Sequence, residues 1–565
     1  MLGSELIAEL FSRKGIRRVF TFPGGTIGPL FDSLVKRDIE LFCSRHEQGA
    51  GYAALAAARL TNTPQVVMVT SGPGVTNLVS CIADAWFDST PLIAITGQVG
   101  TGDLTSGRAV RQTGFQQIDT CALMKPIAKA VFLPMSPVEL PAIMEKAFTL
   151  AAEGRPGPVV IDLPMDVQRG SLEWIFSGDF PKSPPLPEPA VENLGVVAEW
   201  LAHASRPVIL AGQGVILAKA CAEVRQLAAW GQIPVAMSLL GLGIIPTNSP
   251  HALGFVGHTG NQYANRAVHE ADLLLVVGAR LDVRQTGTRT DRFVPDGKVI
   301  RIDIDAAELD FPRVKSHLDV YADAKLALRQ LLAELTAKAR PDLNGWHSTI
   351  RGWKRQFALN YSHDDGALKP QMVIETVNRL TAGEDVIVVS GVGSHQQWTA
   401  RHFDFDLPAR AWLTSGGHGT MGYDLPTAIG AQLAFPERTV LCFVGDGSLQ
   451  MNIQELQTAI QYHTPVKIFV LDNHRLAIVS QFQLLNWKSD PTTGNKINPD
   501  FVAIGRAYGF TCFRLDKSED SEAVIAAALA EPGPVLVHCL IDPNEDVTPM
   551  LLAGQTMDAM WPYGQ

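Results

Sequence analysis

The amino-acid sequence predicts an α/β protein built from three doubly wound parallel-sheet domains. Short apolar runs rich in β-branched residues recur between helical stretches, at 66–70, 91–96, 158–162, 207–212, 272–278, 298–305, 385–390, 439–445, 466–472 and 534–540. Because these runs are continuous rather than alternating, they are typical of parallel strands buried on both faces. The length of 565 residues agrees, since a domain commonly contains about 100 to 200 residues.

Two stretches interrupt this rhythm and indicate connections between domains. Residues 176–193 are rich in proline, and residues 340–370 carry no strand pattern. Such segments are typical of interdomain linkers. We therefore expect domains at 1–175, 190–340 and 365–545.

The first and last of these domains resemble each other. Each contains a strand, a glycine turn, a helix, a Thr-Pro pair and a second strand, with 19 residues from Gly72 to Pro91 and 18 from Gly447 to Pro465. Two unrelated β-α-β units could give this pattern, but so could a duplicated domain on either side of a different middle one. Duplication predicts a site shared between the outer domains.

Composition excludes several classes of partner. Lys and Arg total 47 against 57 for Asp and Glu, a net charge of −10, so we expect neither a nucleic acid nor an anionic membrane surface as a partner. The seven cysteines form no CxxC pair, which favours neither a disulfide framework nor a zinc site. No apolar run reaches the roughly 18 to 20 residues of a membrane-spanning helix, and we expect a reducing, cytoplasmic compartment.

The strongest local signal is the strand-to-helix turn Gly445-Asp446-Gly447-Ser448. Glycines here let backbone N–H groups approach a phosphate at the positive end of a helix. Asp446 offers an oxygen ligand, and Asn473, 27 residues later at the next strand end, can complete a Mg²⁺ site. The turn alone is common; its spacing to Asn473 favours a site for a diphosphate and Mg²⁺.

Glu47 lies at the start of a small-residue helix, in SRHEQGAGYAALAAARL. An acid in such an apolar neighbourhood has a raised pKa, which suits proton exchange with a weakly basic heterocycle. The alternative is a first-turn acid that the helix dipole favours.

Several motifs in order carry a family resemblance over about residues 4–560. They are FPGGTIGPLFDSL, SRHEQGAGYAA, TSGPGVTNL, GFQQID, GRPGPVVIDLP, LLVVGARLD, LTSGGHGTMGYDLPTAIGAQ, GDGSLQMNIQEL and LDNHRLAIVSQFQ. The chain resembles the thiamine diphosphate-dependent enzymes, and within them the acetohydroxyacid synthase (acetolactate synthase) catalytic subunit. This resemblance implies a pyrimidine-binding first domain, a nucleotide-binding-like central domain and a last domain that binds the diphosphate. It also implies that Glu47 hydrogen-bonds N1′ of the cofactor's aminopyrimidine across a dimer interface.

The resemblance assigns further residues to the site. Asp446, Asn473 and the Arg475 carbonyl match the metal ligands. Matches to cofactor contacts are Ser394, His395, Gly419 and Met421, beside Gly447 and Ser448 of the glycine turn. Matches to residues near the substrate are Gly25, Phe115, Gln116 and Lys129, although Lys129 alone reads equally well as a surface cation.

The middle domain carries AGQGV, GARLDVR, RIDID and YADAK, which resemble the FAD-binding loops of acetohydroxyacid synthases. The implied contacts are Gly212, Gly214, Gly278 and Arg280 for the phosphates and flavin edge, and Asp303 and Asp323 near the adenosine. The residues themselves indicate only a Rossmann-like fold, because no full GxGxxG fingerprint occurs. Related decarboxylases leave this domain empty or use another nucleotide.

Some positions depart from the family pattern. Phe482 stands where the family has a Trp that selects 2-oxobutyrate as acceptor, Ser394 where it usually has Gln, and His418 where it has Leu. Asp424, Ala477, Thr21 and Thr259 are further changes on cofactor-facing loops. His418 adds a titratable group near the cofactor, so we consider an acceptor other than pyruvate or 2-oxobutyrate.

The leading hypothesis is a lyase-carboligase that decarboxylates pyruvate, or a similar 2-oxo acid, and passes the two-carbon unit to a second 2-oxo acid. The alternative is a specialised carboligase or decarboxylase of secondary or sugar metabolism that uses another acceptor, such as an aldehyde. A non-catalytic regulatory subunit is disfavoured because Glu47, Asp446 and Asn473 are all present, and a glyoxylate carboligase because that subfamily lacks the glutamate. We expect a homodimer or homotetramer; whether a regulatory subunit binds stays open.

Overall fold

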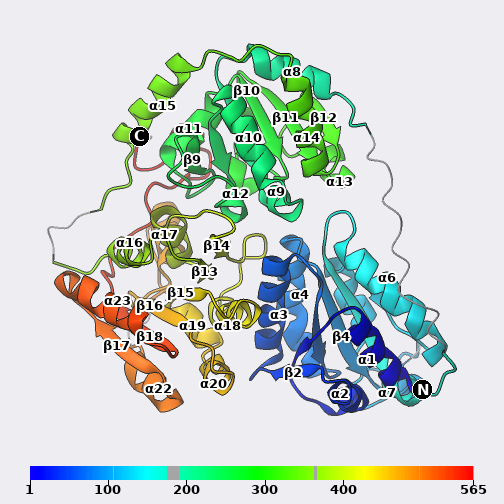
Figure 1. Ribbon diagram of the computed structural model, residues 1–565. Helices are drawn as coiled ribbons and strands as arrows, with labels where there is room; N and C mark the ends of the chain where they lie inside the picture. The colour runs from blue at the N-terminus through cyan, green and yellow to red at the C-terminus, as the bar shows by residue number, and fades with distance from the viewer. Residues whose placement is uncertain (106, 175–189, 362–365, 495–496, 564–565) are drawn as a thin grey trace.

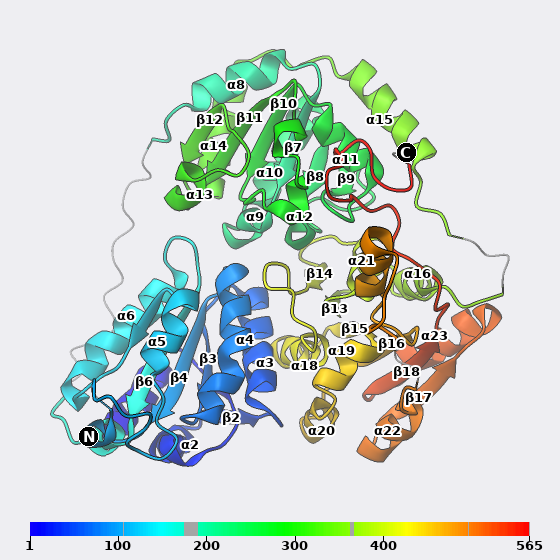
Figure 2. The same cartoon turned by 180° about the vertical axis from the view of Figure 1, so that it is seen from behind.

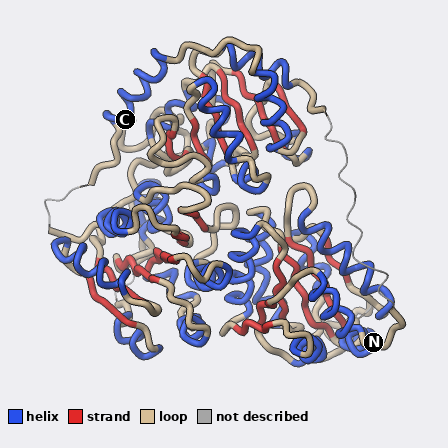
Figure 3. The backbone as a smooth tube through the Cα atoms, viewed as in Figure 1, coloured by secondary structure: helices blue, strands red, loops and turns tan. Residues whose placement is uncertain are grey.

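The computed structural model describes residues 1–105, 107–174, 190–361, 366–494 and 497–563. In this part of the chain the strands form three six-stranded parallel sheets. Each sheet lies in its own lobe between layers of helices (Figure 1; Figure 3). The α/β class with three doubly wound domains is therefore confirmed. Most of the expected linker 176–193 lies outside the described residues.

The N-terminal sheet has the strand order β2-β1-β3-β4-β6-β5. Its strands are β1 (Arg18–Thr21), β2 (Glu40–Cys43), β3 (Gln65–Val69), β4 (Leu92–Gln98), β5 (Ala130–Phe132) and β6 (Pro158–Pro164). Its helices are α1 (Gly3–Arg13), η1 (Gly25–Ile27), α2 (Gly28–Val35), α3 (Glu47–Thr61), α4 (Pro73–Phe87), η2 (Thr101–Asp103), α5 (Thr120–Met124), η3 (Lys125–Ile127), η4 (Pro137–Glu139), α6 (Leu140–Ala152) and α7 (Met165–Arg169). Every residue of β4 and β6 is buried, as parallel strands covered on both faces require.

The C-terminal sheet repeats this topology, with the order β14-β13-β15-β16-β18-β17. Its strands are β13 (Val386–Ser390), β14 (Arg410–Leu413), β15 (Thr439–Gly445), β16 (Lys467–Asp472), β17 (Thr511–Leu515) and β18 (Val535–Leu540). Its helices are α16 (Pro370–Leu380), α17 (Ser394–His402), α18 (Asp424–Ala434), α19 (Asp446–Met451), α20 (Glu455–Gln461), α21 (Ala477–Trp487), α22 (Phe501–Tyr508), η7 (Ser518–Asp520) and α23 (Ser521–Ala530). Numbered within each domain, the two orders are identical, which favours duplication over two unrelated units.

The central sheet has a different order, β12-β11-β10-β7-β8-β9. Its strands are β7 (Pro207–Ala211), β8 (Val235–Met237), β9 (Ala252–Phe255), β10 (Leu273–Val277), β11 (Lys298–Asp303) and β12 (Leu318–Tyr321). Its helices are α8 (Leu194–His203), α9 (Gln213–Leu217), α10 (Cys221–Gly231), η5 (Leu239–Gly241), α11 (Gln262–His269), α12 (Val283–Thr286), η6 (Thr290–Arg292), α13 (Ala306–Asp310), α14 (Ala324–Leu335) and α15 (Asn344–Gln356).

Two segments pack on this central domain from outside its expected bounds. Helix α15 falls in the stretch 340–370 that we expected to be a linker, but its Trp346 is buried and donates a hydrogen bond from Nε1 to the Pro207 carbonyl at 3.2 Å. The C-terminal segment returns to the same domain, where the Leu551 N–H donates to the His258 carbonyl at 2.7 Å (Figure 2). Both segments bury apolar side chains that a strand pattern does not reveal.

The two outer domains share one hydrophobic core because α3 packs along α18 (Figure 1). A Cβ on Gly430 would lie 2.2 Å from the Ala53 carbonyl oxygen, so the small residues of both helices permit this approach. Tyr52 and Tyr423 meet edge to face, with ring centroids 5.2 Å apart. Among the described residues, no helix is long and apolar enough to cross a membrane.

Candidate active site

The C-terminal half of the candidate site lies where β13, β15 and β16 end. Asp446 directly follows β15 and Asn473 directly follows β16, and both side chains are buried. The chain order of the sheet reverses between β13 and β15, which is where doubly wound sheets bind ligands. A pocket at this edge, here called the smaller pocket, is lined by Ser394, His395, Met421, Asp446, Gly447, Ser448, Asn473, Arg475 and their neighbours.

Asn498 fixes the orientation of Asp446. Its Nδ2 donates hydrogen bonds to Asp446 Oδ2 and to Asp472 Oδ1, both at 2.7 Å. His538 Nε2 lies 2.8 Å from the other oxygen of Asp472. Burial opposes ionisation of Asp472, but the hydrogen bonds from His538 and from the His474 N–H lower the pKa of this carboxyl. Sequence reasoning did not find Asn498, because no motif links residue 498 to the strand ends.

The smaller pocket fits a diphosphate with Mg²⁺. The Ser394 hydroxyl, in the first residue of α17, is buried and has no hydrogen-bond partner among the described residues. An unpaired buried hydroxyl at a helix start is suited to an anionic oxygen. Asp446 and Asn473 supply the carboxylate and amide oxygens that Mg²⁺ prefers.

His395 lines the smaller pocket, and its ring also contacts a buried carboxylate. Its Nε2 lies 3.2 Å from Asp424 Oδ1, and both side chains are buried. The same carboxylate accepts hydrogen bonds from the Gly391 N–H and the Ser448 hydroxyl. The His395 ring therefore contacts the Asp424 carboxylate and at the same time lines the smaller pocket.

The N-terminal half of the site gathers around the turn from Thr70 to Gly74, in the motif TSGPG. Glu47, the first residue of α3, is buried and accepts a hydrogen bond from Asn77 Nδ2 at 3.0 Å. A Cβ on Gly74 would lie 3.6 Å from Glu47 Oε1, and one on Gly72 would lie 2.9 Å from Gln116 Cβ. The duplicated topology thus brings separate motifs of the N-terminal domain to one turn.

Gly25 and Phe115 each directly precede a residue that lies against this turn, Thr26 and Gln116 respectively. Gly25 begins η1, whose next residue, Thr26, hydrogen-bonds Thr70 at 2.9 Å through their hydroxyls. Phe115 is 84% exposed. Glu47, Gly25, Phe115 and Gln116 line neither the smaller pocket nor the larger cavity described below.

Comparisons with known proteins agree with this geometry. Residues 1–123, 194–331 and 391–539 match the N-terminal TPP binding domain, the central domain and the C-terminal TPP binding domain of thiamine pyrophosphate enzymes. The chain is 40% identical over 559 residues to the acetolactate synthase isozyme 1 large subunit of Escherichia coli (strain K12), covering 98% of this chain and 96% of that one. It is 38% identical over 572 residues to acetolactate synthase 2, chloroplastic, of Zea mays, covering 98% and 87%.

The chain belongs to the acetolactate synthase large-subunit family. The resemblance seen in the sequence is thereby confirmed, and the protein is a thiamine diphosphate-dependent enzyme.

A cavity of about 600 Å³, here called the larger cavity, lies between the three domains. Of the residues that resemble the family's FAD-binding loops, Gly214, Gly278, Arg280, Asp303 and Asp323 line it, and Gly212 directly precedes the lining residue Gln213. Gly278 has a φ of +58°, and a Cβ there would lie 2.6 Å from Gly214 Cα, so both loops require glycine. The volume is within the range of about 300 to 1,000 Å³ typical of ligand pockets.

Asp303 and Asp323, the two acids that the resemblance places near the adenosine, differ in their surroundings. Burial raises the pKa of Asp303. Asp323 is the N-cap of α14 and accepts hydrogen bonds from the Lys325 and Leu326 N–H groups at 2.9 and 3.0 Å. The Asp323 carboxylate is therefore partly engaged by its own helix.

Of the residues that depart from the pattern of the acetolactate synthase family, His418 lines the larger cavity and its ring stacks on Phe87, with centroids 5.7 Å apart. Phe482 lies on α21, one turn beyond Ile478, which lines both cavities. Its ring is 42% exposed and meets Trp487 edge to face at 5.5 Å.

Lys129 is not part of either cavity. Its ammonium donates hydrogen bonds to the Glu153 and Arg155 carbonyls at 2.6 and 2.9 Å. These hydrogen bonds connect the residue before β5 to the loop before β6, so they stabilise the fold of the N-terminal domain. The expected place of Lys129 in the substrate channel therefore finds no support within one chain.

Proposed function

We propose that this chain, with thiamine diphosphate and Mg²⁺, decarboxylates pyruvate and joins the two-carbon unit to a second 2-oxo acid, giving an acetolactate-type product. The observation that carries the proposal is the pairing of two half-sites. One is the buried pocket of Asp446, Asn473 and the unpaired Ser394 hydroxyl, and the other is the buried Glu47 at the start of α3.

In this proposal Asp446, Asn473 and the Arg475 carbonyl hold Mg²⁺. The diphosphate is bound by Ser394 and by the N–H groups of Gly447 and Ser448 at the start of α19. Met421 and Gly419 orient the aminopyrimidine. The bound cofactor supplies an electron sink for the carbon that loses CO₂. Asp446, Asn473, Ser394 and Ser448 are buried, which limits the access of water to this part of the site.

Glu47 holds a proton at N1′ of the aminopyrimidine. Its carboxylate is aimed by Asn77, and its neighbours in α3 are small and apolar. An acid held within hydrogen-bonding distance can give this proton to the ring nitrogen and take it back. Gln116, Phe115 and Gly25 lie on the same side of the N-terminal domain and are proposed to contact the substrate.

A second copy of the chain completes the site. The residues of the N-terminal half-site line neither cavity of their own chain, and Phe115 is largely exposed. We infer that the half-site around Glu47 faces the smaller pocket of a partner, which makes a homodimer the minimum active unit and permits a homotetramer. Because relatives are named large subunits, a smaller regulatory subunit is a further proposed partner.

The larger cavity is proposed to bind FAD. Its volume, its glycine loops Gly212–Gly214 and Gly278, and Arg280 for a phosphate support this assignment. Neither decarboxylation nor carboligation transfers net electrons, so the flavin would have a structural role. We also propose the domain bounds 1–175, 190–340 and 365–545, although α15 (Asn344–Gln356) and the C-terminal segment pack on the central domain from outside these bounds.

A specialised carboligase with another acceptor is the second candidate. Exposed Phe482 beside the lining residue Ile478, and His418 on the wall of the larger cavity, favour it. Phe482 is smaller than the Trp of the family pattern, and His418 can carry a charge that the Leu of the family pattern cannot.

The test is product analysis by mass spectrometry. The purified full chain is incubated with Mg²⁺, thiamine diphosphate and pyruvate, alone and with a panel of 2-oxo acids and aldehydes. We expect acetolactate from pyruvate alone, and Glu47→Gln should abolish it while thiamine diphosphate still binds. A product formed only with an aldehyde would support the second candidate, and full activity of Glu47→Gln would remove Glu47 from the mechanism.

A further inference from the structure

One loop, Thr414–Met421, forms part of the wall of both cavities. Ser415–Gly419 line the larger cavity, and Met421 lines the smaller pocket. On the cavity side this loop is open: Gly417, His418 and Gly419 are exposed, and a Cβ on Gly419 would meet nothing within 4 Å. The loop must therefore be held from its other side.

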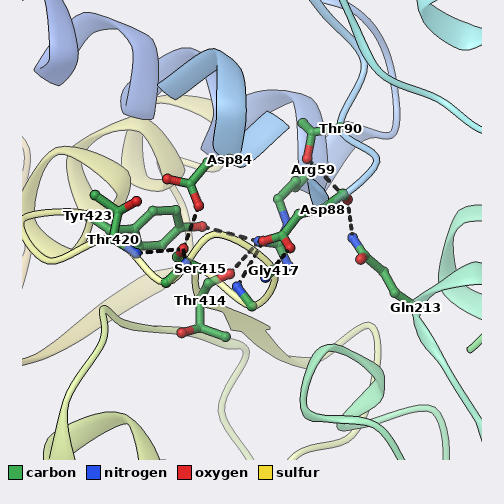
Figure 4. A network of polar contacts seen from close by, with 12 residues as sticks. Arg59, Asp84, Asp88, Thr90, Gln213, Thr414, Ser415, Gly417, Thr420 and Tyr423 are labelled. Atoms are coloured by element: carbon green, nitrogen blue, oxygen red, sulfur yellow. Dashed lines mark hydrogen bonds and ion pairs between the residues drawn. The ribbon is translucent and has the colours of Figure 1, made fainter. Parts of the chain in front are cut away.

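Asp88 holds it there. This residue caps the C-terminal end of α4 in the N-terminal domain, and it is 1% exposed. Its carboxylate accepts hydrogen bonds from the Gly416 and Gly417 N–H groups at 2.9 and 2.7 Å. Arg59 Nη1 lies 3.6 Å from the same carboxylate and donates to the Thr414 carbonyl at 2.6 Å (Figure 4).

A second carboxylate supports the middle of the loop. The Ser415 hydroxyl donates to Asp84, one turn earlier in α4, and accepts the Gly419 and Thr420 N–H groups at 2.9 and 3.0 Å (Figure 4). From the central domain, Gln213 Nε2 donates to the Asp88 carbonyl at 2.9 Å. The contacts around Asp88 thus join all three domains.

Charge makes these contacts strong. A buried carboxylate that accepts two backbone N–H groups forms charge-assisted hydrogen bonds, and the adjacent guanidinium compensates the buried charge. The loop also lies so close to its neighbours that two positions require glycine: a Cβ on Gly417 would lie 2.7 Å from Phe87 Cβ, and one on Gly416 would lie 2.6 Å from a Leu240 methyl carbon. The loop therefore has one well-defined position while Asp88 is present.

We propose that Asp88 is a positioning residue that presets this loop for both cofactors at once. The proposal rests on the proposed function, in which the larger cavity binds FAD and the smaller pocket binds thiamine diphosphate. With the loop preset, each cofactor binds to a wall that is already formed. Without the Asp88 charge the loop becomes mobile, the first cofactor to bind orders it, and the second then binds to an ordered wall. Loss of Asp88 should therefore create cooperativity between two cofactors that otherwise bind independently.

The experiment measures affinities with the full chain after removal of cofactors by dialysis. FAD affinity is measured by quenching of flavin fluorescence, with and without saturating thiamine diphosphate and Mg²⁺. Thiamine diphosphate affinity is measured by calorimetry, with and without FAD. The variants are Asp88→Asn and, as a milder change in the same network, Ser415→Ala. The matched control is Asp406→Asn, which breaks an ion pair with Arg225 between the central and C-terminal domains at 2.9 Å and lines neither cavity.

In the wild type and in Asp406→Asn, each cofactor should change the affinity for the other by less than about twofold. In Asp88→Asn each cofactor alone should bind about 10- to 100-fold more weakly, as expected for lost charge-assisted hydrogen bonds, and saturation with one should restore the affinity for the other. Ser415→Ala should show the same pattern more weakly, and it decides the question if Asp88→Asn does not fold.

Unchanged affinities in folded Asp88→Asn, or a loss that the second cofactor does not restore, would overturn the proposal. Strong coupling in the wild type would overturn it as well, because a preset loop gives none. If wild-type protein forms acetolactate but binds no FAD, the assignment of the larger cavity fails together with this proposal, while the proposed reaction stands.

Discussion

Asp424→Gly tests whether the hydrogen bonds of the buried Asp424 carboxylate, behind the smaller pocket, stabilise the fold of this chain. The family pattern that the sequence resembles has glycine at this position, so the change moves the sequence toward that pattern. In this structure, however, the Asp424 carboxylate accepts hydrogen bonds from the Gly391 N–H, the Ser448 hydroxyl and His395, and it is 1% exposed. Removing it leaves these groups without their acceptor.

Each buried group left unpaired costs about 1–3 kcal/mol, and water entering the vacated space recovers part of this. We therefore expect a net loss of about 3 kcal/mol, which for a domain of this size lowers Tm by roughly 6–12 °C. Differential scanning calorimetry of wild type and variant measures this shift. Asp500→Gly is the control, because Asp500 is exposed and caps α22 by accepting a hydrogen bond from the Ala503 N–H. Glycine is itself tolerated at the N-cap, so this variant should lose only about 0.3 kcal/mol. A Tm of Asp424→Gly at or above the wild-type value would refute the reasoning.

Three further changes test other parts of the molecule. Burial raises the pKa of Glu455 to about 7. The folded state therefore holds more protons than the unfolded state between about pH 4.5 and 7, and stability falls as pH rises through that window. Glu455→Gln should flatten this dependence of Tm on pH, and an unchanged dependence in the variant would show that Glu455 does not cause it. Phe482→Trp should raise the use of 2-oxobutyrate over pyruvate as acceptor by roughly 10-fold or more; an unchanged product ratio in a mixed-substrate assay would show that Phe482 does not contact the acceptor. Asn498→Ala should weaken Mg²⁺-dependent binding of thiamine diphosphate by about 10- to 100-fold, as expected for loss of a group that orients a metal ligand. Calorimetry measures this affinity, with Asn344→Ala, a change at an exposed residue, as the control. Equal affinities of the two variants would contradict this role of Asn498.

The fold can be predicted well from the sequence because buried strands and turns are encoded by residues that are close together in the chain. Continuous apolar runs indicate buried parallel strands wherever both faces are covered, and the glycine turn at Asp446 indicates a ligand site at a strand end. What the sequence does not reveal depends on packing between distant segments. Helix α15 has no strand pattern and is placed by burial of Trp346, and Lys129 is placed by carbonyls in another loop. Asn498 reaches Asp446 from 52 residues away.

Duplication explains why the outer domains divide the cofactor between them. Glu47 begins the helix after β2, and Asp424 begins the topologically equivalent helix after β14, and these helices, α3 and α18, pack against each other. Each acid accepts a hydrogen bond from the next helix of its own domain, Asn77 in α4 and Ser448 in α19.

The two positions have nevertheless diverged. In the C-terminal domain the helix after β15 starts with Asp446, the proposed metal ligand, whereas in the N-terminal domain the helix after β3 starts with Pro73 and has no acid in its first turn. In the proposed site, Mg²⁺ and the diphosphate therefore belong to the C-terminal domain, whose own first acid, Asp424, is engaged by three donors. Glu47 has a single side-chain donor, Asn77, among the described contacts, so it retains the lone pairs that a proton at a heterocyclic nitrogen requires. This difference in hydrogen bonding, rather than in fold, is why the proposed function places the proton in one domain and the phosphates in the other.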